Sequence, residues 1–152
     1  MKMTMSQMFV DKNILYKEYD FQLRKNRRSS GLNRDVAKEN LLCMKSILES
    51  AGIVFFIIFG TLLGAIREGN FIEHDTDTDT GIFENDREKF LSVIPIIIDN
   101  GFELIRTKKP DDLITFMRND EYIDIGIFNE GGIWPFKYYF YQHHKISDFF
   151  LG

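Results

Sequence analysis

Residues 75–80 alternate strictly between aspartate and threonine, and Gly81, Ile82 and Phe83 follow. Successive side chains of a β-strand point to opposite faces, so an alternation of this kind is typical of a strand. We therefore predict a strand over residues 75–83. Its Asp75, Asp77 and Asp79 side chains would project to one side at spacings of about 6.6 Å, with the threonines on the other side.

The three aligned carboxylates indicate a metal site. Like charges on one face repel one another and raise one another's pKa unless a cation neutralises them. Hard oxygen ligands favour magnesium, manganese or calcium over zinc. The residues therefore predict a divalent metal ion at Asp75, Asp77 and Asp79, and the expected cofactor is Mg²⁺ or Mn²⁺.

Two other interpretations of the acidic run stay open. One is a solvated edge strand, whose charges protect the sheet from aggregation. The other is an EF-hand loop, but this fits poorly because Thr80 stands where that loop requires glycine, and Asp86 stands where it requires a bidentate glutamate.

A further aspartate lies in the β-branched segment 122–128. Ile123, Ile125 and Ile127 form one consistent core face there, and Asp124 falls on the opposite face. If this strand is a neighbour of the first, Asp124 meets the acidic cluster. The alternative is an ordinary exposed aspartate.

A glycine-threonine pair separates an apolar segment from a predicted helix. Residues 54–59 predict a buried strand, Gly60 and Thr61 break it, and residues 62–67 predict a short helix. Such a junction presents backbone N–H groups and the positive end of the helix dipole to a phosphate. It is not a P-loop, because no Gly-Lys-Ser/Thr follows. Arg67 could reach a diphosphate or be solvated.

The order of elements predicts a mixed α+β domain, with helices covering a small mixed sheet. Residues 1–32 are polar and are expected to form an N-terminal arm, and residues 33–152 are expected to form the core. Two further helices are predicted: one is capped by Asn33 and ends near Gly52, and the other covers 86–99, where Pro95 should kink or end it. Three further strands are predicted over 102–106, 113–118 and 122–128. A turn at Asn119-Asp120 would join the last two.

Composition limits which binding partners and which cellular compartment we expect. The chain of 152 residues suits one domain, and its formal charge of -4 provides no global positive field for nucleic acid or an anionic membrane. The apolar stretch 54–66 is shorter than the ~20 residues that a membrane helix needs. Cys43 is the lone cysteine, and residues 1–8 lack the apolar region of a secretory signal, so we expect a cytoplasmic protein.

Three consecutive motifs together resemble the signature of the LicD/fukutin-like family: the segments Phe-Gly-Thr-Leu-Leu-Gly-Ala-Ile-Arg at 59–67, Gly-Asn-Phe-Ile at 69–72 and Asp-Thr-Asp-Thr-Asp-Thr-Gly-Ile at 75–82. The resemblance covers residues 33–128 approximately. It implies the nucleotidyltransferase fold of the DNA polymerase beta-like superfamily. The chain departs from the pattern at Glu73-His74, where many members have Pro-Trp, and it is expected to lack the family's usual C-terminal acceptor-binding extension.

The resemblance also implies an activity. Members transfer a phosphocholine or phospho-alditol unit from a CDP-linked donor to a glycan hydroxyl. The implied roles are donor-phosphate binding by Gly60 and Thr61, metal binding by the pair Asp77 and Asp79 with support from Asp75, and a third carboxylate at Asp124. Asp124 can also help to deprotonate the acceptor, and Arg67 is a further candidate for binding the donor phosphate. The alternatives are transfer of a nucleotide monophosphate from an NTP to a protein or small molecule, and a non-catalytic relative that binds a nucleotide or a partner.

Overall fold

The structure is a computed structural model that describes residues 31–108 and 113–128. The predicted N-terminal arm therefore lies outside the described residues, apart from Gly31 and Leu32, and so does the predicted core beyond Phe128. Leu32 is buried, and its N–H donates to the Asp75 carbonyl oxygen at 2.8 Å. This contact ties the start of the described chain to the acidic segment.

The described chain contains three α-helices, one 3-10 helix and five strands. In order they are α3 (Arg34–Ser50), β1 (Phe55–Ile57), α4 (Phe59–Glu68), β2 (Asp77–Phe83), η1 (Glu84–Asp86), α5 (Arg87–Asp99), β3 (Glu103–Lys108), β4 (Leu113–Arg118) and β5 (Glu121–Phe128).

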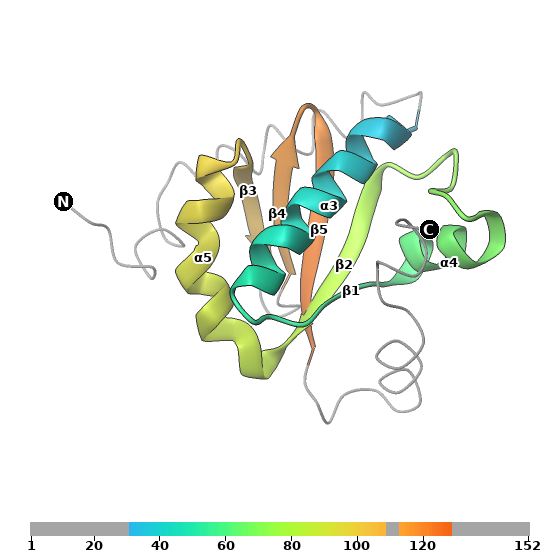
Figure 1. The fold of residues 1–152 in the computed structure, drawn as a ribbon. Coiled ribbons are helices and arrows are strands. Elements are labelled where there is room, and N and C mark those ends of the chain that lie inside the picture. Colours follow the sequence, from blue (N-terminus) through green and yellow to red (C-terminus); the bar gives the residue numbers. More distant parts are fainter. Residues whose placement is uncertain (1–30, 109–112, 129–152) are drawn as a thin grey trace.

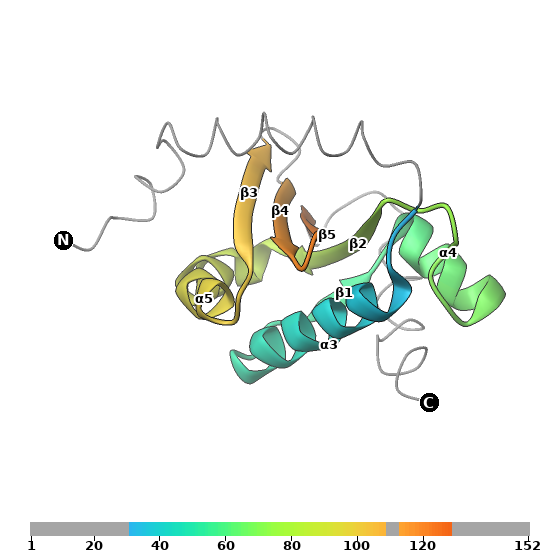
Figure 2. The same ribbon diagram turned by 90° about the horizontal axis from the view of Figure 1, so that it is seen from above.

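The five strands form one mixed sheet in the order β1-β2-β5-β4-β3. The strands β2 and β5 are parallel, and the other neighbouring pairs are antiparallel. Helices α3 and α5 lie against the same face, whereas α4 lies beyond β1 at the sheet's edge (Figures 1 and 2). The predicted α+β class, with helices covering a small sheet, is confirmed.

Helix α3 supplies a large part of the core. The Asn33 side chain caps it by accepting hydrogen bonds from the N–H groups of the first turn, as predicted. Its Leu41, Met44 and Leu48 side chains are fully buried, and burial of each contributes about 1.5–3 kcal/mol. The helix ends before Gly52, whose φ of 74° is the left-handed conformation expected after a helix C-terminus.

Helix α5 is held to the sheet by aromatic contacts. The Phe116 ring of β4 packs edge-on against Phe90 of α5 and against Phe102, with centroid distances of 6.3 and 6.5 Å. The helix continues past Pro95 to Asp99, so of the two predicted effects, a kink or an end, the end does not occur. Pro95 lies on the exposed side, where water can satisfy the carbonyl that its missing N–H leaves without a partner.

Three boundaries near the predicted site differ from the expected ones. Strand β1 is only three residues long, because the Ile58 N–H makes the last bond to β2 and the Ile58 carbonyl then accepts the first bond of α4. Helix α4 consequently begins at Phe59, three residues earlier than predicted. Strand β2 begins at Asp77, so Asp75 precedes it.

The predicted turn between β4 and β5 is confirmed. Asn119 and Asp120 have φ values of 54° and 63°, the two positive values of a type I′ hairpin turn. No helix within residues 31–108 and 113–128 has the length and apolar character to cross a membrane.

Candidate metal centre

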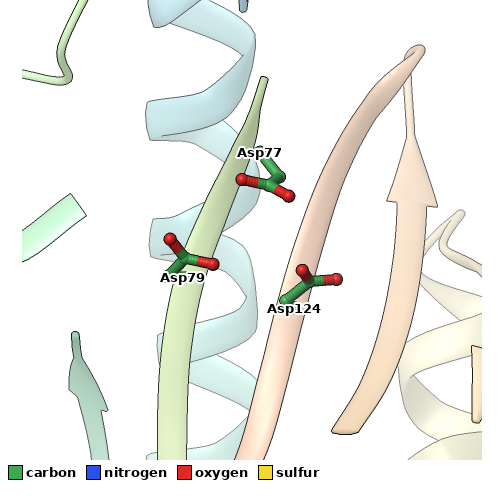
Figure 3. Close-up of side chains that lie close together, drawn as sticks. All are labelled: Asp77, Asp79 and Asp124. Carbon is green, nitrogen blue, oxygen red and sulfur yellow. The ribbon is translucent and has the colours of Figure 1, made fainter. Parts of the chain in front are cut away.

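Three aspartates meet between the two parallel central strands. Asp77 and Asp79 belong to β2, and the register places Asp79 directly opposite Asp124 of β5. One carboxylate oxygen from each residue lies within 4.8 Å of the others. Figure 3 shows the three carboxylates gathered over the β2–β5 boundary. The condition on which the sequence prediction depended, that these two strands are neighbours, is therefore confirmed.

The cluster lies on the face of the sheet that α3 and α5 leave uncovered. Ile123 and Ile125 flank Asp124 in β5 and belong to the core beneath the helices, so strand alternation turns Asp124 the other way. The Thr80 hydroxyl, on the core side, donates to the Asp124 carbonyl oxygen at 2.7 Å. This bond fixes β2 and β5 to each other immediately beside the acidic side chains.

Asp75 does not belong to this group of three. It precedes β2, and its carboxylate lies against the start of α4: a Cβ added to Gly60 would be 3.0 Å from its Oδ2. That oxygen is buried and accepts no hydrogen bond. Burial raises the pKa of Asp75 above its ordinary value, and the nearby Asp77 and Glu68 raise it further. The structure thus places Asp75 beside the site, where a supporting role stays a prediction.

The raised pKa of Asp75 gives a pH-dependent expectation. An acid whose pKa is higher in the folded state destabilises that state as the pH rises through the folded-state pKa. Asp75→Asn should therefore increase the free energy of unfolding at neutral pH, and this gain should vanish below the ordinary aspartate pKa. Thermal unfolding of both proteins in EDTA, at acidic and neutral pH, measures the difference. An equal effect at both pH values contradicts the expectation.

The first turn of α4 is an open helix N-terminus. Its N-cap residue Ile58 makes no side-chain capping bond, and the helical ladder begins with the Leu62 N–H donating to the Ile58 carbonyl oxygen at 3.1 Å. The N–H groups that precede Leu62 lie outside this ladder. Such groups, together with the helix dipole, favour an anion.

Thr61 ties this turn to the acidic strand. Its Oγ1 accepts a hydrogen bond from the Asp79 N–H at 2.8 Å, and the residue is fully buried. The side chain therefore acts as an anchor between α4 and β2. Contact with a phosphate at this turn would come from backbone N–H groups, including that of Gly60.

We expect Thr61→Val to weaken this anchor. Valine has nearly the same shape but cannot accept the Asp79 N–H bond, so the free energy of unfolding should fall by about 1 kcal/mol. Thr61→Ser keeps the hydroxyl and loses one buried methyl group, so it reports the packing contribution separately. Urea unfolding of the three proteins measures the effects, and a valine variant as stable as the wild type would argue against the anchor.

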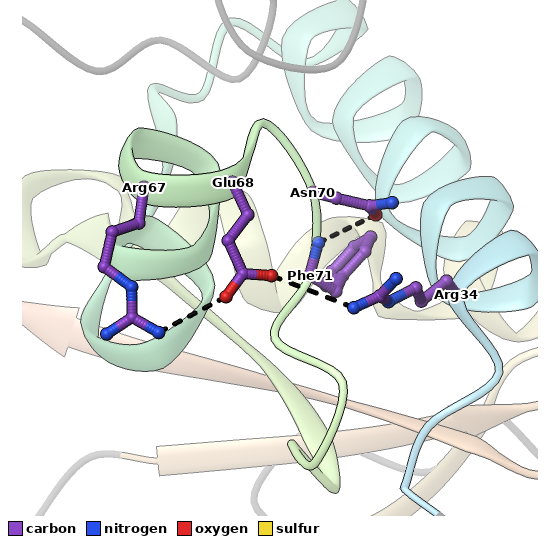
Figure 4. Close-up of polar contacts among 5 residues, drawn as sticks. All are labelled: Arg34, Arg67, Glu68, Asn70 and Phe71. Atoms are coloured by element: carbon purple, nitrogen blue, oxygen red, sulfur yellow. Dashed lines mark hydrogen bonds and ion pairs between the residues drawn. The ribbon is translucent and has the colours of Figure 1, made fainter.

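Arg67 is not brought to the acidic cluster. It lies in the last turn of α4, at the opposite end from Gly60, and its side chain is 58% exposed. Its Nη2 is 3.3 Å from Glu68 Oε1, and Glu68 also approaches Arg34 of α3 at 3.8 Å (Figure 4). In this conformation Arg67 takes part in a surface ion-pair chain.

Two residues beside the cluster were missed by sequence reasoning. The Thr115 hydroxyl of β4 donates to Asp124 Oδ1 at 2.5 Å, and Arg106 of β3 donates through Nε to Thr115 Oγ1 at 3.0 Å. Arg106 Nη2 is also 3.9 Å from Asp124 Oδ2. The only hint in the sequence was that Thr115 is the polar residue inside an otherwise apolar strand segment.

The donor set fits a divalent cation. All three gathered side chains are carboxylates, the ligands that Mg²⁺ and Mn²⁺ prefer. When ionised they carry three negative charges, and the Arg106 guanidinium offsets one of these. Asp77 and Asp79 are half-buried while Asp124 is buried, so a ligand can approach the centre from the β2 side.

Comparison with known proteins finds a family model that matches the part of the chain carrying these elements. A family model described as LicD/FKTN/FKRP, nucleotidyltransferase domain, matches residues 52–149 of the 152 residues. The matched region includes α4, the acidic strand β2 and the Asp124 strand β5. No curated protein matches the chain.

Proposed function

The chain belongs to the LicD/FKTN/FKRP family, whose domain indicates a phosphotransferase-like role in glycan modification, and we propose that it is a metal-dependent enzyme of this kind. The proposed reaction moves a substituted phosphate, of the phosphocholine or phospho-alditol type, from a CDP-linked donor to a glycan hydroxyl. The proposed cofactor is Mg²⁺ or Mn²⁺ held by Asp77, Asp79 and Asp124.

One observation carries this proposal. The Asp79 N–H is bonded to Thr61 of the α4 turn, while Asp79 itself stands opposite Asp124 in the sheet. An open helix N-terminus, suited to phosphate, is therefore fixed next to three carboxylates suited to a cation. A nucleotide diphosphate presents the anionic oxygens that both features bind.

The residues suggest how the transfer is assisted. The Gly60 N–H would orient the donor diphosphate, and the buried Thr61 would hold this turn against β2. The acceptor hydroxyl oxygen forms a bond to the phosphorus that carries the substituent, the bond to the bridging oxygen breaks, and CMP leaves. A bound metal ion would supply charge stabilisation for the diphosphate.

The hydroxyl proton passes to one of the three carboxylates. Asp124, the base implied by the family resemblance, is 6% exposed and already accepts the Thr115 hydroxyl bond. Asp77 and Asp79 are half-buried. Proton removal by one of these two more accessible aspartates, with Asp124 acting as a metal ligand, therefore agrees better with the observed burial.

Calorimetric titration with CDP-choline, CDP-ribitol, CTP and ATP, each with and without Mg²⁺, tests the proposal. We expect metal-dependent binding of a CDP-linked compound and loss of that binding in Asp77→Ala. Preferential binding of triphosphates would favour nucleotidyl transfer. Absence of binding by all four compounds would favour a non-catalytic relative.

The fate of the donor separates the two transfer reactions. A donor labelled separately in its cytidine and choline groups should release labelled CMP while the choline label enters the acceptor. Retention of the cytidine label on the acceptor would contradict phosphocholine transfer and would support transfer of a nucleotide.

A further inference from the structure

The geometry points to Arg106 as a positioning residue that acts through Thr115 to orient the Asp124 carboxylate for metal binding. This inference rests on the proposed metal-dependent function. Arg106 belongs to β3, an edge strand of the sheet, and is separated from the acidic strand β2 by β4 and β5. The family resemblance assigned no role to Arg106.

An irregularity in β3 aims Arg106 at the site. The register with β4 shifts by one residue, since Leu104 is opposite Phe116 but Arg106 is opposite Thr115. With regular pairing Arg106 would be opposite Ile114, a core residue on the face that the helices cover. A β-bulge at this position moves the side chain to the Asp124 face, and bulges commonly redirect side chains next to active sites.

The contacts of Arg106 form a directed chain. Its Nε donates to Thr115 Oγ1 at 3.0 Å, and the Thr115 hydroxyl in turn donates to Asp124 Oδ1 at 2.5 Å. The Arg106 and Asp124 side chains are only 11% and 9% exposed. Because donating to Asp124 commits the hydroxyl hydrogen, the Thr115 oxygen can only accept from other groups, and Arg106 supplies such a donor. The rotation of the Asp124 carboxylate is thereby fixed.

A purely electrostatic role for Arg106 predicts the opposite effect on metal binding. If Arg106 served only as a counter-ion for Asp124, its positive charge would repel the metal, and its removal would strengthen metal binding. If it positions Asp124, its removal should weaken binding by about 10–100-fold, the usual effect of losing a residue that orients a metal ligand. The sign of the change in metal affinity therefore distinguishes the two roles.

Titration of the metal-free protein with Mn²⁺ tests the inference. We expect Arg106→Gln and Thr115→Val each to weaken Mn²⁺ binding at least tenfold, while Thr115→Ser retains the wild-type affinity. The matched control is Arg118→Gln. Arg118 lies on the neighbouring strand, donates to Asn40 Oδ1 at 2.8 Å and stacks over Phe102, so its loss should lower stability and leave Mn²⁺ affinity unchanged.

A double variant tests whether Arg106 acts through Asp124. In an Asp124→Asn background, Arg106→Gln should cause no further loss of Mn²⁺ affinity. Wild-type binding that Arg106→Gln leaves unchanged or strengthens would overturn the positioning role alone. Failure of the wild-type protein to bind Mn²⁺ would overturn the proposed metal-dependent function, and the positioning role with it.

Discussion

Asp79→Asn is expected to abolish metal-dependent donor binding and to slow release of CMP from CDP-choline by about 10³-fold or more. Asparagine keeps the shape of the side chain but removes one of the three charges that hold the cation, and loss of a metal's charge stabilisation amounts to several kcal/mol in the transition state. Calorimetry with Mn²⁺ and CDP-choline, followed by a CMP release assay, measures both effects.

The loss should arise from the site and not from unfolding. Asp79 is half-buried, and the Thr61 bond is made by its backbone N–H, which the substitution keeps. The free energy of unfolding of the metal-free protein should change by less than about 1 kcal/mol. Asp99→Asn, at the exposed end of α5, is the matched control and should leave both binding and turnover unchanged. Turnover that persists in Asp79→Asn contradicts the assignment.

Gly64→Ala is expected to destabilise the protein by about 2 kcal/mol. In a helix interior without steric conflict, this change should stabilise by about 1 kcal/mol because alanine has the higher helix propensity. At Gly64, however, a Cβ would lie 2.5 Å from the Asn70 carbonyl oxygen and 3.0 Å from the Ile72 backbone nitrogen. Backbone atoms cannot rotate away, so relief of the clash should cost about 3 kcal/mol. Chemical denaturation measures the net change.

A second glycine provides the control for Gly64. Gly69, which ends the same helix, has a φ of 65° and nothing within 4 Å of an added Cβ, so Gly69→Ala should cost about 1 kcal/mol from backbone strain alone. In Gly64→Ala the clash should displace residues 70–75, which lead into β2, and should therefore weaken Mn²⁺ binding. Gly69→Ala should leave Mn²⁺ binding unchanged. If Gly64→Ala stabilised the protein, α4 could not pack as closely against Asn70 and Ile72 as the structure shows.

The local patterns predicted most of the elements because each pattern reflects one face of a packed element. The aspartate-threonine alternation predicted β2 and the common side of Asp77 and Asp79, and the isoleucine alternation placed Asp124 away from the core. What alternation cannot show is which strands pair. The meeting of Asp79 with Asp124 required a parallel pair between two strands that are far apart in the sequence, and this became visible only in the sheet.

The errors and omissions have identifiable causes. Asp75 continues the sequence alternation but does not belong to β2, which begins at Asp77. Its N–H donates to the Ile72 carbonyl oxygen in a turn, and its own carbonyl oxygen accepts the Leu32 N–H. Arg106 was missed because a bulge redirects it, and a one-residue register shift leaves no signal in residue types. For Arg67 the sequence left donor binding and solvation open, and the length of α4 separates this residue from Gly60.

Anomalous diffraction from crystals of the protein with Mn²⁺ and CDP-choline would locate the metal ion and the donor together. We predict a manganese peak within direct ligand distance of carboxylate oxygens of Asp77, Asp79 and Asp124, with the donor diphosphate reaching both the metal and the first turn of α4. A bound CDP-choline whose diphosphate lies away from these three aspartates, with no manganese peak between them, would contradict the account.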